Sequence, residues 1–263
     1  MPGFREIQVP VRVGPRELQL AAWNRDTGSE HLLLFVHGLG CSKRSFQGAW
    51  AEPRLRAFSL LAVDLPGFGR SPRPEGYSYE LDEQAGVLTA LIDAHATRRI
   101  HVVAHSMGGS LALLVPPRTL ARLDNLVLVE PRLLKESCGV AAEASRHEFD
   151  EFQREFMPQF RQRCMADPRV TFDVDLADPV AFHAAARSLL HWAGTGELLD
   201  RFLHAPCPVW FWYGQDNRHL AELSHLPAAQ TQSFSDAAHF PMQDNPSAFY
   251  GHLAALVGAA PRR

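Results

Sequence analysis

The segment around Ser106 contains the residue types and spacing of an activated serine nucleophile. Ser106 lies in the sequence AHSMGG (residues 104–109), between a buried apolar run and a helical pattern. Small residues two places before and after a serine permit a tight strand–turn–helix connection that strains the backbone and exposes the hydroxyl. Ala104 stands where glycine is usual, and its methyl group still meets the requirement for a small side chain. The pattern predicts that Ser106 is a nucleophile rather than only a helix N-cap.

A turn of this kind needs a sheet to hold it, and the surrounding sequence predicts one. Helices are expected over residues 45–56 and 79–97, from Ser106 onward, and over residues 249–257. The alternation of such helices with buried strands predicts an α/β fold with a mostly parallel, doubly wound sheet covered by helices on both faces. The strands are expected over residues 4–12, 16–24, 31–36, 58–64, 100–105, 126–130 and 209–214.

Residues 131–206 form an insertion between the last two of these strands. The segment is far longer than the connections of about 2 to 6 residues that are typical between helix and strand. Asp178-Pro179 predicts the N-cap and first residue of a helix that ends at Gly194, and a shorter helix is expected over residues 197–203. The predicted domains are therefore a core of residues 1–130 and 207–263 and a helical unit of residues 131–206.

Composition excludes several classes of protein. The 263 residues are 46% hydrophobic with a net charge of −3, which favours a globular chain without an electrostatic preference for nucleic acid or anionic membranes. No apolar run reaches the roughly 18 residues that span a bilayer, and the first residues lack the pattern of a secretory signal. A cytoplasmic protein is expected. The four cysteines lie far apart, and no metal or nucleotide motif occurs, so we expect no metal and no cofactor.

Four motifs, in order along nearly the whole chain, resemble those of the α/β-hydrolase family. The resemblance implies an α/β-hydrolase fold whose helical insertion, between the sixth and seventh strands, is a cap. It also implies a serine hydrolase of the esterase type, since related dehalogenases and epoxide hydrolases carry aspartate in place of Ser106. The motifs are HGLG (residues 37–40), DLPGFGRS (residues 64–71), AHSMGG (residues 104–109) and DAAHFP (residues 236–241).

The resemblance also assigns roles to individual residues. His239, in the last motif, is expected to take the proton from the Ser106 hydroxyl, because a serine hydroxyl is a poor nucleophile at neutral pH. The backbone N–H groups of Leu39 and Met107 are expected to form the oxyanion hole.

The acid that orients His239 departs from the commonest pattern of the family. The usual position, three residues after the glycine that ends the VWFWYG strand, is Asn217, whose neutral amide cannot stabilise an imidazolium. Glu130, at the end of the preceding strand, is the preferred candidate, since some family members carry their acid there. Asp216 is the alternative, although it needs a remodelled turn.

Several residues of the insertion have two interpretations. Phe149, Phe152 and Phe156 are spaced for one face of a helix, continued by Phe160, and with Met157 they are candidates for a substrate pocket. The same spacing is equally typical of core packing. Arg132 is expected to form a surface ion pair, with contact to a substrate carboxylate as the alternative.

These observations predict a cofactor-independent hydrolase that cleaves a small or medium, largely apolar carboxylic ester through an acyl-enzyme. Thioesters, lactones and activated carbon–carbon bonds fit the same machinery. A ligand receptor with the same fold and very slow turnover is a further alternative. The expected partner is a small-molecule substrate, and the chain is expected to be a monomer or a homodimer.

Overall fold

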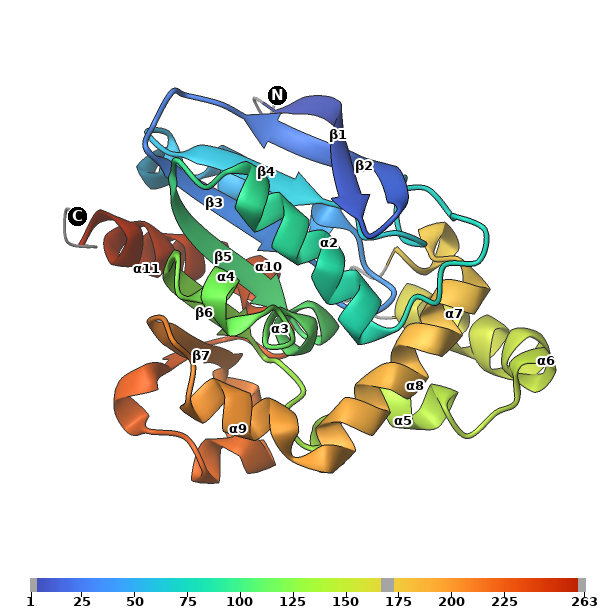
Figure 1. The fold of residues 1–263 in the computed structure, drawn as a ribbon. Coiled ribbons are helices and arrows are strands. Elements are labelled where there is room, and N and C mark those ends of the chain that lie inside the picture. Colours follow the sequence, from blue (N-terminus) through green and yellow to red (C-terminus); the bar gives the residue numbers. More distant parts are fainter. Residues whose placement is uncertain (1–3, 167–172, 260–263) are drawn as a thin grey trace.

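The computed structural model describes residues 4–166 and 173–259, and these form one eight-stranded sheet with helices on both faces (Figure 1). The strand order is β1-β2-β4-β3-β5-β6-β7-β8. The first two neighbouring pairs, β1 with β2 and β2 with β4, are antiparallel, and the remaining pairs are parallel. The predicted fold class is confirmed. The strands are β1 (Arg5–Val13), β2 (Arg16–Arg25), β3 (His31–Val36), β4 (Ser59–Val63), β5 (Arg99–His105), β6 (Leu123–Val129), β7 (Val209–Gly214) and β8 (Thr231–Phe234).

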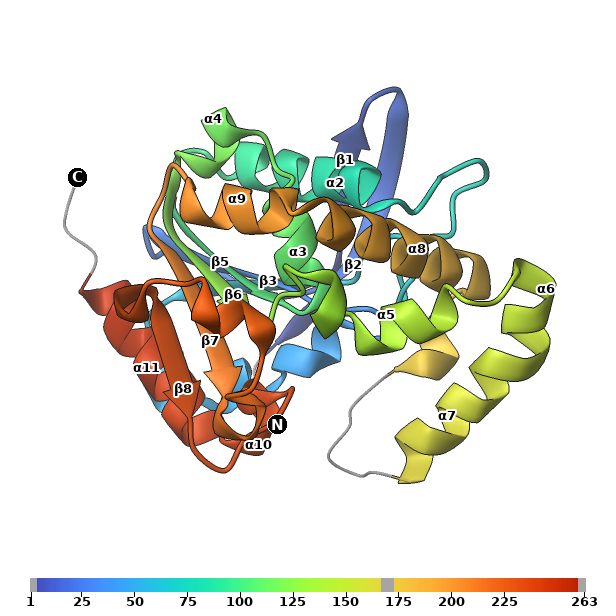
Figure 2. The ribbon, with the colours of Figure 1, turned by 90° about the horizontal axis from the view of Figure 1, so that it is seen from below.

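Helices cover both faces because the central strands are apolar on both. In β3, Leu32 and Leu34 belong to the apolar cluster on one face, whereas Leu33 and Phe35 belong to the cluster on the other. Figure 2 shows α2, α3 and α9 on the first face and α11 on the second. The longer helices are α2 (Leu81–Ala94), α3 (Met107–Ala112), α5 (Gly139–Ala144), α7 (Met157–Ala166), α8 (Pro179–Thr195), α9 (Glu197–Leu203) and α11 (Pro246–Gly258). Shorter α-helical turns are α1 (Gly48–Ala51), α4 (Pro117–Leu120), α6 (Phe149–Glu151) and α10 (Pro241–Asp244).

The helix expected over residues 45–56 is wrong as a single element. The chain there forms three short pieces, η1 (Lys43–Phe46), α1 and η2 (Pro53–Leu55). Pro53 has no N–H to continue a helix, and it instead begins η2. Gly48 packs closely on α11, since a Cβ at this position would lie 2.7 Å from the Tyr250 ring.

The expected end of α8 at Gly194 is also wrong. The helix continues to Thr195, and Gly196, with a φ of 78°, provides the left-handed residue that ends it. The predicted start holds, since the Asp178 carboxylate accepts hydrogen bonds from Val180 N–H at 2.8 Å and Ala181 N–H at 3.2 Å. α9 has the predicted bounds.

The strand β8 was not expected from the sequence. Its residues, TQSF, are mostly polar because it lies at the edge of the sheet, paired on one side with β7. An edge strand with a solvent face lacks the apolar run that marks the central strands.

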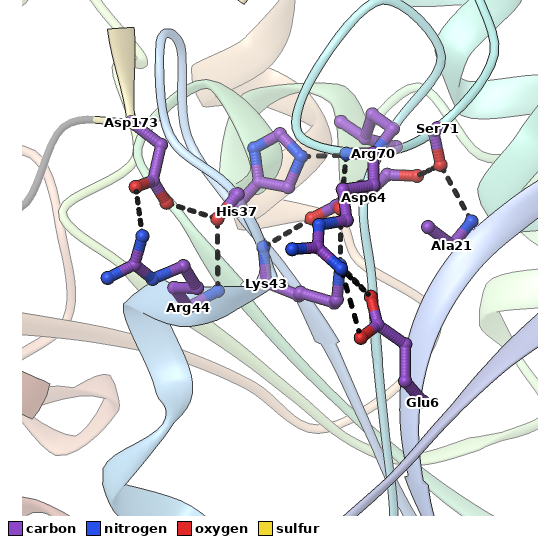
Figure 3. A network of polar contacts seen from close by, with 11 residues as sticks. Glu6, Ala21, His37, Lys43, Arg44, Asp64, Arg70, Ser71 and Asp173 are labelled. Atoms are coloured by element: carbon purple, nitrogen blue, oxygen red, sulfur yellow. Dashed lines mark hydrogen bonds and ion pairs between the residues drawn. The ribbon is translucent and has the colours of Figure 1, made fainter. Parts of the chain in front are cut away.

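The segment between β6 and β7 is helical, as expected; α5, α6, α7 and most of α8 lie beyond the end of the sheet toward which the arrows of β4 and β5 point, whereas α9 covers the first face (Figures 1 and 2). Residues 167–172 of this segment lie outside the described residues. Asp173 bonds the Ser42 hydroxyl and pairs with Arg44 at 3.1 Å (Figure 3), and Ser188 Oγ accepts from Leu81 N–H at 3.0 Å. Buried apolar residues of the segment also join the cluster on the α2 face of the sheet. Its helices are α5, α6, the π-helical turn η4 (Phe152–Phe156), α7, α8 and α9, with the 3-10 turns η3 (Lys135–Ser137) and η5 (Val174–Leu176).

Three more 3-10 turns, η6 (Gln215–Asn217), η7 (Ala221–Ser224) and η8 (Ala228–Gln230), lie between β7 and β8. Among the helices that the structure describes, none has the length and apolar character needed to cross a membrane.

Candidate active site

Ser106 lies at the sharp turn between β5 and α3, in a backbone conformation that residues other than glycine rarely adopt. Its φ is 52° and its ψ is −120°. The Ser106 N–H donates to the Val129 carbonyl at 2.8 Å, and the Ser106 carbonyl accepts from Gly109 N–H at 2.9 Å. A non-glycine residue at positive φ costs roughly 1–3 kcal/mol and is concentrated at functional sites. The strained turn predicted from the sequence is therefore present, with Ser106 8% exposed.

Two glycines let this turn lie directly against the loop after β3. A Cβ at Gly108 would lie 2.4 Å from the His37 carbonyl oxygen, which is too close for any side chain. A Cβ at Gly38 would lie 3.0 Å from the Cβ of Ser106. Glycine is needed at 108 because two backbone segments meet there.

Because the two segments lie so close, the backbone amides of the predicted oxyanion hole, one from each segment, lie near Ser106. Met107 follows Ser106 as the first residue of α3, and Leu39 follows Gly38 in the loop. Within the described part of the chain, neither the Leu39 nor the Met107 N–H is used in a hydrogen bond. Both donors are therefore available to an oxygen bound at Ser106.

A buried ion pair between Lys43 and Asp64 fixes the chain that follows β3 (Figure 3). The Asp64 carboxylate accepts from Lys43 Nζ at 2.6 Å, from Lys43 N–H at 2.7 Å and from Arg70 N–H at 2.8 Å. Both side chains are buried, and Glu6 lies 3.7 Å from the Lys43 ammonium. The carboxylate thus ties the chain after β3 to the chain after β4.

His37 makes a second tie between the same two loops. Its Nδ1 donates to the Gly38 carbonyl at 2.8 Å, and its Nε2 accepts from Leu65 N–H at 3.0 Å. This pattern requires the neutral imidazole. Burial lowers the pKa of His37, in agreement with that state.

His239 and Glu130 form the shortest link between two predicted site residues. His239 lies in the loop between β8 and α10, and its Nδ1 is 2.7 Å from Glu130 Oε2. Glu130 directly follows β6, is fully buried and has a φ of 47°. A carboxylate at this distance accepts the Nδ1 hydrogen and leaves Nε2 as the basic nitrogen.

The Glu130 carboxylate is held by donors from the end of β7. Gly214 N–H donates to Oε1 at 3.0 Å, and Asn217 Nδ2 lies 2.9 Å from Oε1 and 2.8 Å from Oε2. Sequence reasoning missed this role of Asn217. The signal was its position, because an amide at the usual place of the acid complements a carboxylate that comes from the neighbouring strand.

Asp216 does not join this group. Its side chain is exposed, and its backbone N–H donates to the Ala237 carbonyl at 3.1 Å. In the part of the chain that the structure describes, no hydrogen bond or ion pair links the Asp216 carboxylate to His239.

Burial shifts the pKa values of Glu130 and His239 in opposite directions, and each shift favours the neutral form of the group. Burial raises the pKa of Glu130, while Arg132, the Asn217 side chain and the Gly214 amide act against that rise. Burial, followed by the positive charge of Arg132, lowers the pKa of His239 well below its usual value. His239 is therefore the neutral imidazole that a general base must be.

Arg132 contacts His239 directly, and the ion pair that the structure describes for it, with Glu130 Oε2 at 3.9 Å, is buried rather than at the surface as expected. Its Nη2 lies 2.8 Å from His239 Nδ1 and 3.3 Å from Nε2, and its side chain is only 16% exposed. Within the described residues, no hydrogen bond joins the Ser106 hydroxyl to His239. The two segments are linked instead through His105, whose Nε2 donates to the His239 carbonyl at 2.9 Å.

The phenylalanines of the insertion pack mainly with one another. They do not share one regular helix, because α6, the π-helical turn η4 and α7 divide the segment. The Phe156 ring lies 5.3 Å from that of Phe152 and 5.5 Å from that of Phe160, and all three contact Phe182 of α8. Buried Met157 and half-buried Phe149 flank them. This packing favours the core interpretation, and substrate contact stays a prediction.

No group of three or more His, Cys, Asp or Glu side chains that could hold a metal ion occurs among residues 4–166 and 173–259.

Known proteins resemble this chain over nearly its full length. Pimeloyl-(acyl-carrier protein) methyl ester esterase of Aeromonas salmonicida is 26% identical over 257 residues, which cover 86% of this chain and 95% of that protein. An N-acyl homoserine lactonase superposes with a TM-score of 0.77 at 16% identity, covering 99% and 98% of the two chains. An esterase from Thermogutta terrifontis superposes with a TM-score of 0.69 at 23% identity, covering 96% and 99%.

The sequence pattern of the Alpha/beta hydrolase family matches residues 33–251, which include all four motifs and both strands that carry Ser106 and Glu130. The two structural likenesses independently show the same fold. The chain therefore belongs to the Alpha/beta hydrolase family.

Proposed function

We propose that the protein is a cofactor-independent serine hydrolase of small or medium, largely apolar carboxylic esters. The observation that carries the proposal is the 2.7 Å contact between His239 and buried Glu130, which His105 links to the strained Ser106 turn through its hydrogen bond to the His239 carbonyl. The names of the similar proteins described above, a methyl ester esterase, a lactonase and an esterase, agree with ester cleavage.

In the proposed reaction, His239 Nε2 takes the proton of the Ser106 hydroxyl while Ser106 Oγ attacks the ester carbonyl carbon. The carbonyl oxygen becomes an oxyanion, which accepts hydrogen bonds from the N–H groups of Leu39 and Met107. The ester C–O bond then breaks, and His239 returns the proton to the departing alcohol. Glu130 stabilises the imidazolium that exists between these two proton transfers.

The acyl-enzyme is released by the same groups in reverse roles. His239 takes a proton from water, the resulting hydroxide attacks the acyl carbon, and the proton returns to Ser106 Oγ as the acid leaves. The helical insertion of residues 131–206 is proposed to cap this site, since its helices α5 to α8 extend beyond the end of the sheet where the loops of β5 and β6 emerge. The cytoplasmic location and the state as monomer or homodimer stay predictions.

Covalent labelling with a fluorophosphonate, followed by peptide mass spectrometry, tests the proposal together with the turnover of short p-nitrophenyl esters. We expect the label on Ser106 and steady turnover, both lost in Ser106→Ala. The control is Ser224→Ala, which removes an exposed hydroxyl in η7 and should change neither. Labelling at another residue contradicts the assignment. Labelling of Ser106 without turnover beyond one equivalent favours the slow receptor instead.

A further inference from the structure

The guanidinium of Arg132 lies against the His239 ring, where Nε2 is the only ring nitrogen with a lone pair to accept its hydrogen when Nδ1 donates to Glu130. Nη2 lies 2.8 Å from Nδ1 and 3.3 Å from Nε2. An imidazole nitrogen has one position in its plane, taken by a hydrogen or by a lone pair. If Nδ1 donates its hydrogen to Glu130 at 2.7 Å, Nδ1 has no lone pair left for Arg132. The arginine therefore competes with Glu130 for the same nitrogen.

The position also opposes the step that His239 must perform. His239 becomes a cation when it takes the proton of Ser106, and a permanent cation within 3.3 Å of both ring nitrogens disfavours that state. The depressed pKa of His239, to which Arg132 contributes, reflects the same repulsion. His239 therefore becomes a stronger base if the guanidinium of Arg132 moves away from it.

The ion pair that Arg132 makes with Glu130 is long in the resting arrangement. Among the described residues, the acidic oxygen nearest to it is Glu130 Oε2, at 3.9 Å. That carboxylate already accepts shorter hydrogen bonds from His239, Gly214 and Asn217. The guanidinium is thus a largely buried cation whose nearest carboxylate is already shared by three other donors.

The backbone of Arg132 is fixed, so that only its side chain needs to move. Arg132 N–H donates to Ser110 Oγ at 3.0 Å, and Ser110 Oγ donates to the Arg132 carbonyl at 3.0 Å. Ser110 belongs to α3, the helix that begins after Ser106. The arginine is therefore anchored to the same helix as the candidate nucleophile.

We propose that the ester cleaved at Ser106 carries a carboxylate near its scissile bond, and that this carboxylate binds Arg132 and withdraws it from His239. The inference rests on the proposed hydrolase function and adds one anionic group to an otherwise apolar ester. A guanidinium presents two parallel N–H donors to a carboxylate, which is a better acceptor than the already bonded imidazole. Binding of the right substrate thus pairs the arginine and frees the base together.

Matched pairs of methyl esters test the inference through kcat/KM for methanol release. The monomethyl esters of succinic, glutaric and adipic acids carry the carboxylate, and methyl butanoate, pentanoate and hexanoate are their neutral counterparts. For the best pair we expect the wild type to prefer the half-ester by roughly tenfold or more, the size of a charge-assisted contact. Protection of Ser106 from fluorophosphonate by the same compounds should give the same ranking.

Arg132→Gln should abolish this preference and should raise kcat/KM for the neutral ester, because the repulsion between the guanidinium and the imidazolium is gone. Arg132→Lys, which keeps the charge without the two-donor fork, should restore part of the preference. In Arg132→Gln the midpoint of the acidic limb of Ser106 labelling against pH should also rise, since a cation that lowers the pKa of His239 has been removed. The control is Arg118→Gln, which removes an exposed guanidinium on α4 and should leave all three readouts unchanged.

Equal rates and equal protection for half-esters and neutral esters would overturn the inference, as would an equal loss of both activities in Arg132→Gln. If Ser106 is labelled and neutral esters are cleaved, those results leave the proposed hydrolase intact. Failure of the hydrolase proposal itself is recognised separately, by the absence of labelling at Ser106.

Discussion

At the scale of single residues, the pKa of His239 sets the pH range in which the site works. Burial and Arg132 both disfavour the imidazolium, so the folded protein holds this pKa below the usual value of about 6.5. Only the neutral imidazole accepts the serine proton, and activity is therefore lost as pH falls through the depressed pKa. We expect the acidic limb of kcat/KM for a neutral ester to have its midpoint below about pH 6.5. A midpoint above that value would contradict this view of the site.

Asn217 is the residue that makes Glu130 acceptable as a buried carboxylate. Its Nδ2 lies within 2.9 Å of both Glu130 oxygens. Asn217→Asp replaces this donor by a second negative charge. The repulsion raises the pKa of the two neighbouring carboxyl groups and weakens the hydrogen bond between Glu130 and His239. We expect kcat to fall by about tenfold or more, although the change restores the acid at the usual position of the family. Gln215→Glu adds the same charge at an exposed position next to the site, and it should be nearly silent. Increased activity in Asn217→Asp would show that position 217 can itself serve as the acid.

At the scale of elements, the helical insertion is held together by aromatic packing. Phe156 is 3% exposed and is stacked between Phe152 and Phe160. Phe156→Ala should lower the free energy of unfolding by about 3–5 kcal/mol, the usual cost of truncating a buried phenylalanine, as measured by urea denaturation. Met165→Ala, which truncates a side chain 84% exposed on α7, is the control and should cost little. A stable Phe156→Ala variant with a changed preference for acyl chain length would instead place this ring in the substrate pocket.

The same elements show where sequence patterns suffice and where they do not. Strands β3 and β5 and the turn at Ser106 follow from local patterns, because burial on both faces and small residues at fixed spacing act over a few neighbouring positions. The end of α8 was misplaced by one residue, since two nearby glycines, Gly194 and Gly196, can each end a helix and it is Gly196 that adopts the left-handed conformation. Strand β8 has no apolar pattern to detect, because it lies at the sheet edge.

At the scale of the whole molecule, the site depends on contacts between residues that are distant in the sequence. Glu130 is 109 positions from His239 in the sequence and 87 positions from Asn217, and it contacts both. Arg132 contacts His239 although 107 positions separate them. The contact of Glu130 with His239 could be predicted, because parallel strands bring their carboxyl ends to one edge of the sheet, whereas the role of Glu130 as the acid stays a prediction. The contact of Arg132 with His239 could not, since side-chain direction over such distances is decided by the packed fold. The ion pair between Asp64 and Lys43 could not be predicted from the sequence for the same reason.

The central claim is that Glu130, rather than Asp216, provides the negative charge that lets His239 activate Ser106. The most direct test is kcat for a short p-nitrophenyl ester, measured in parallel for Glu130→Gln and Asp216→Asn. Glu130→Gln keeps the volume of the side chain but removes the charge beside Nδ1, so kcat should fall by about two to four orders of magnitude. Asp216→Asn, a change in an exposed side chain, should leave kcat close to that of the wild type. A large loss in Asp216→Asn with a mild effect in Glu130→Gln would contradict the account.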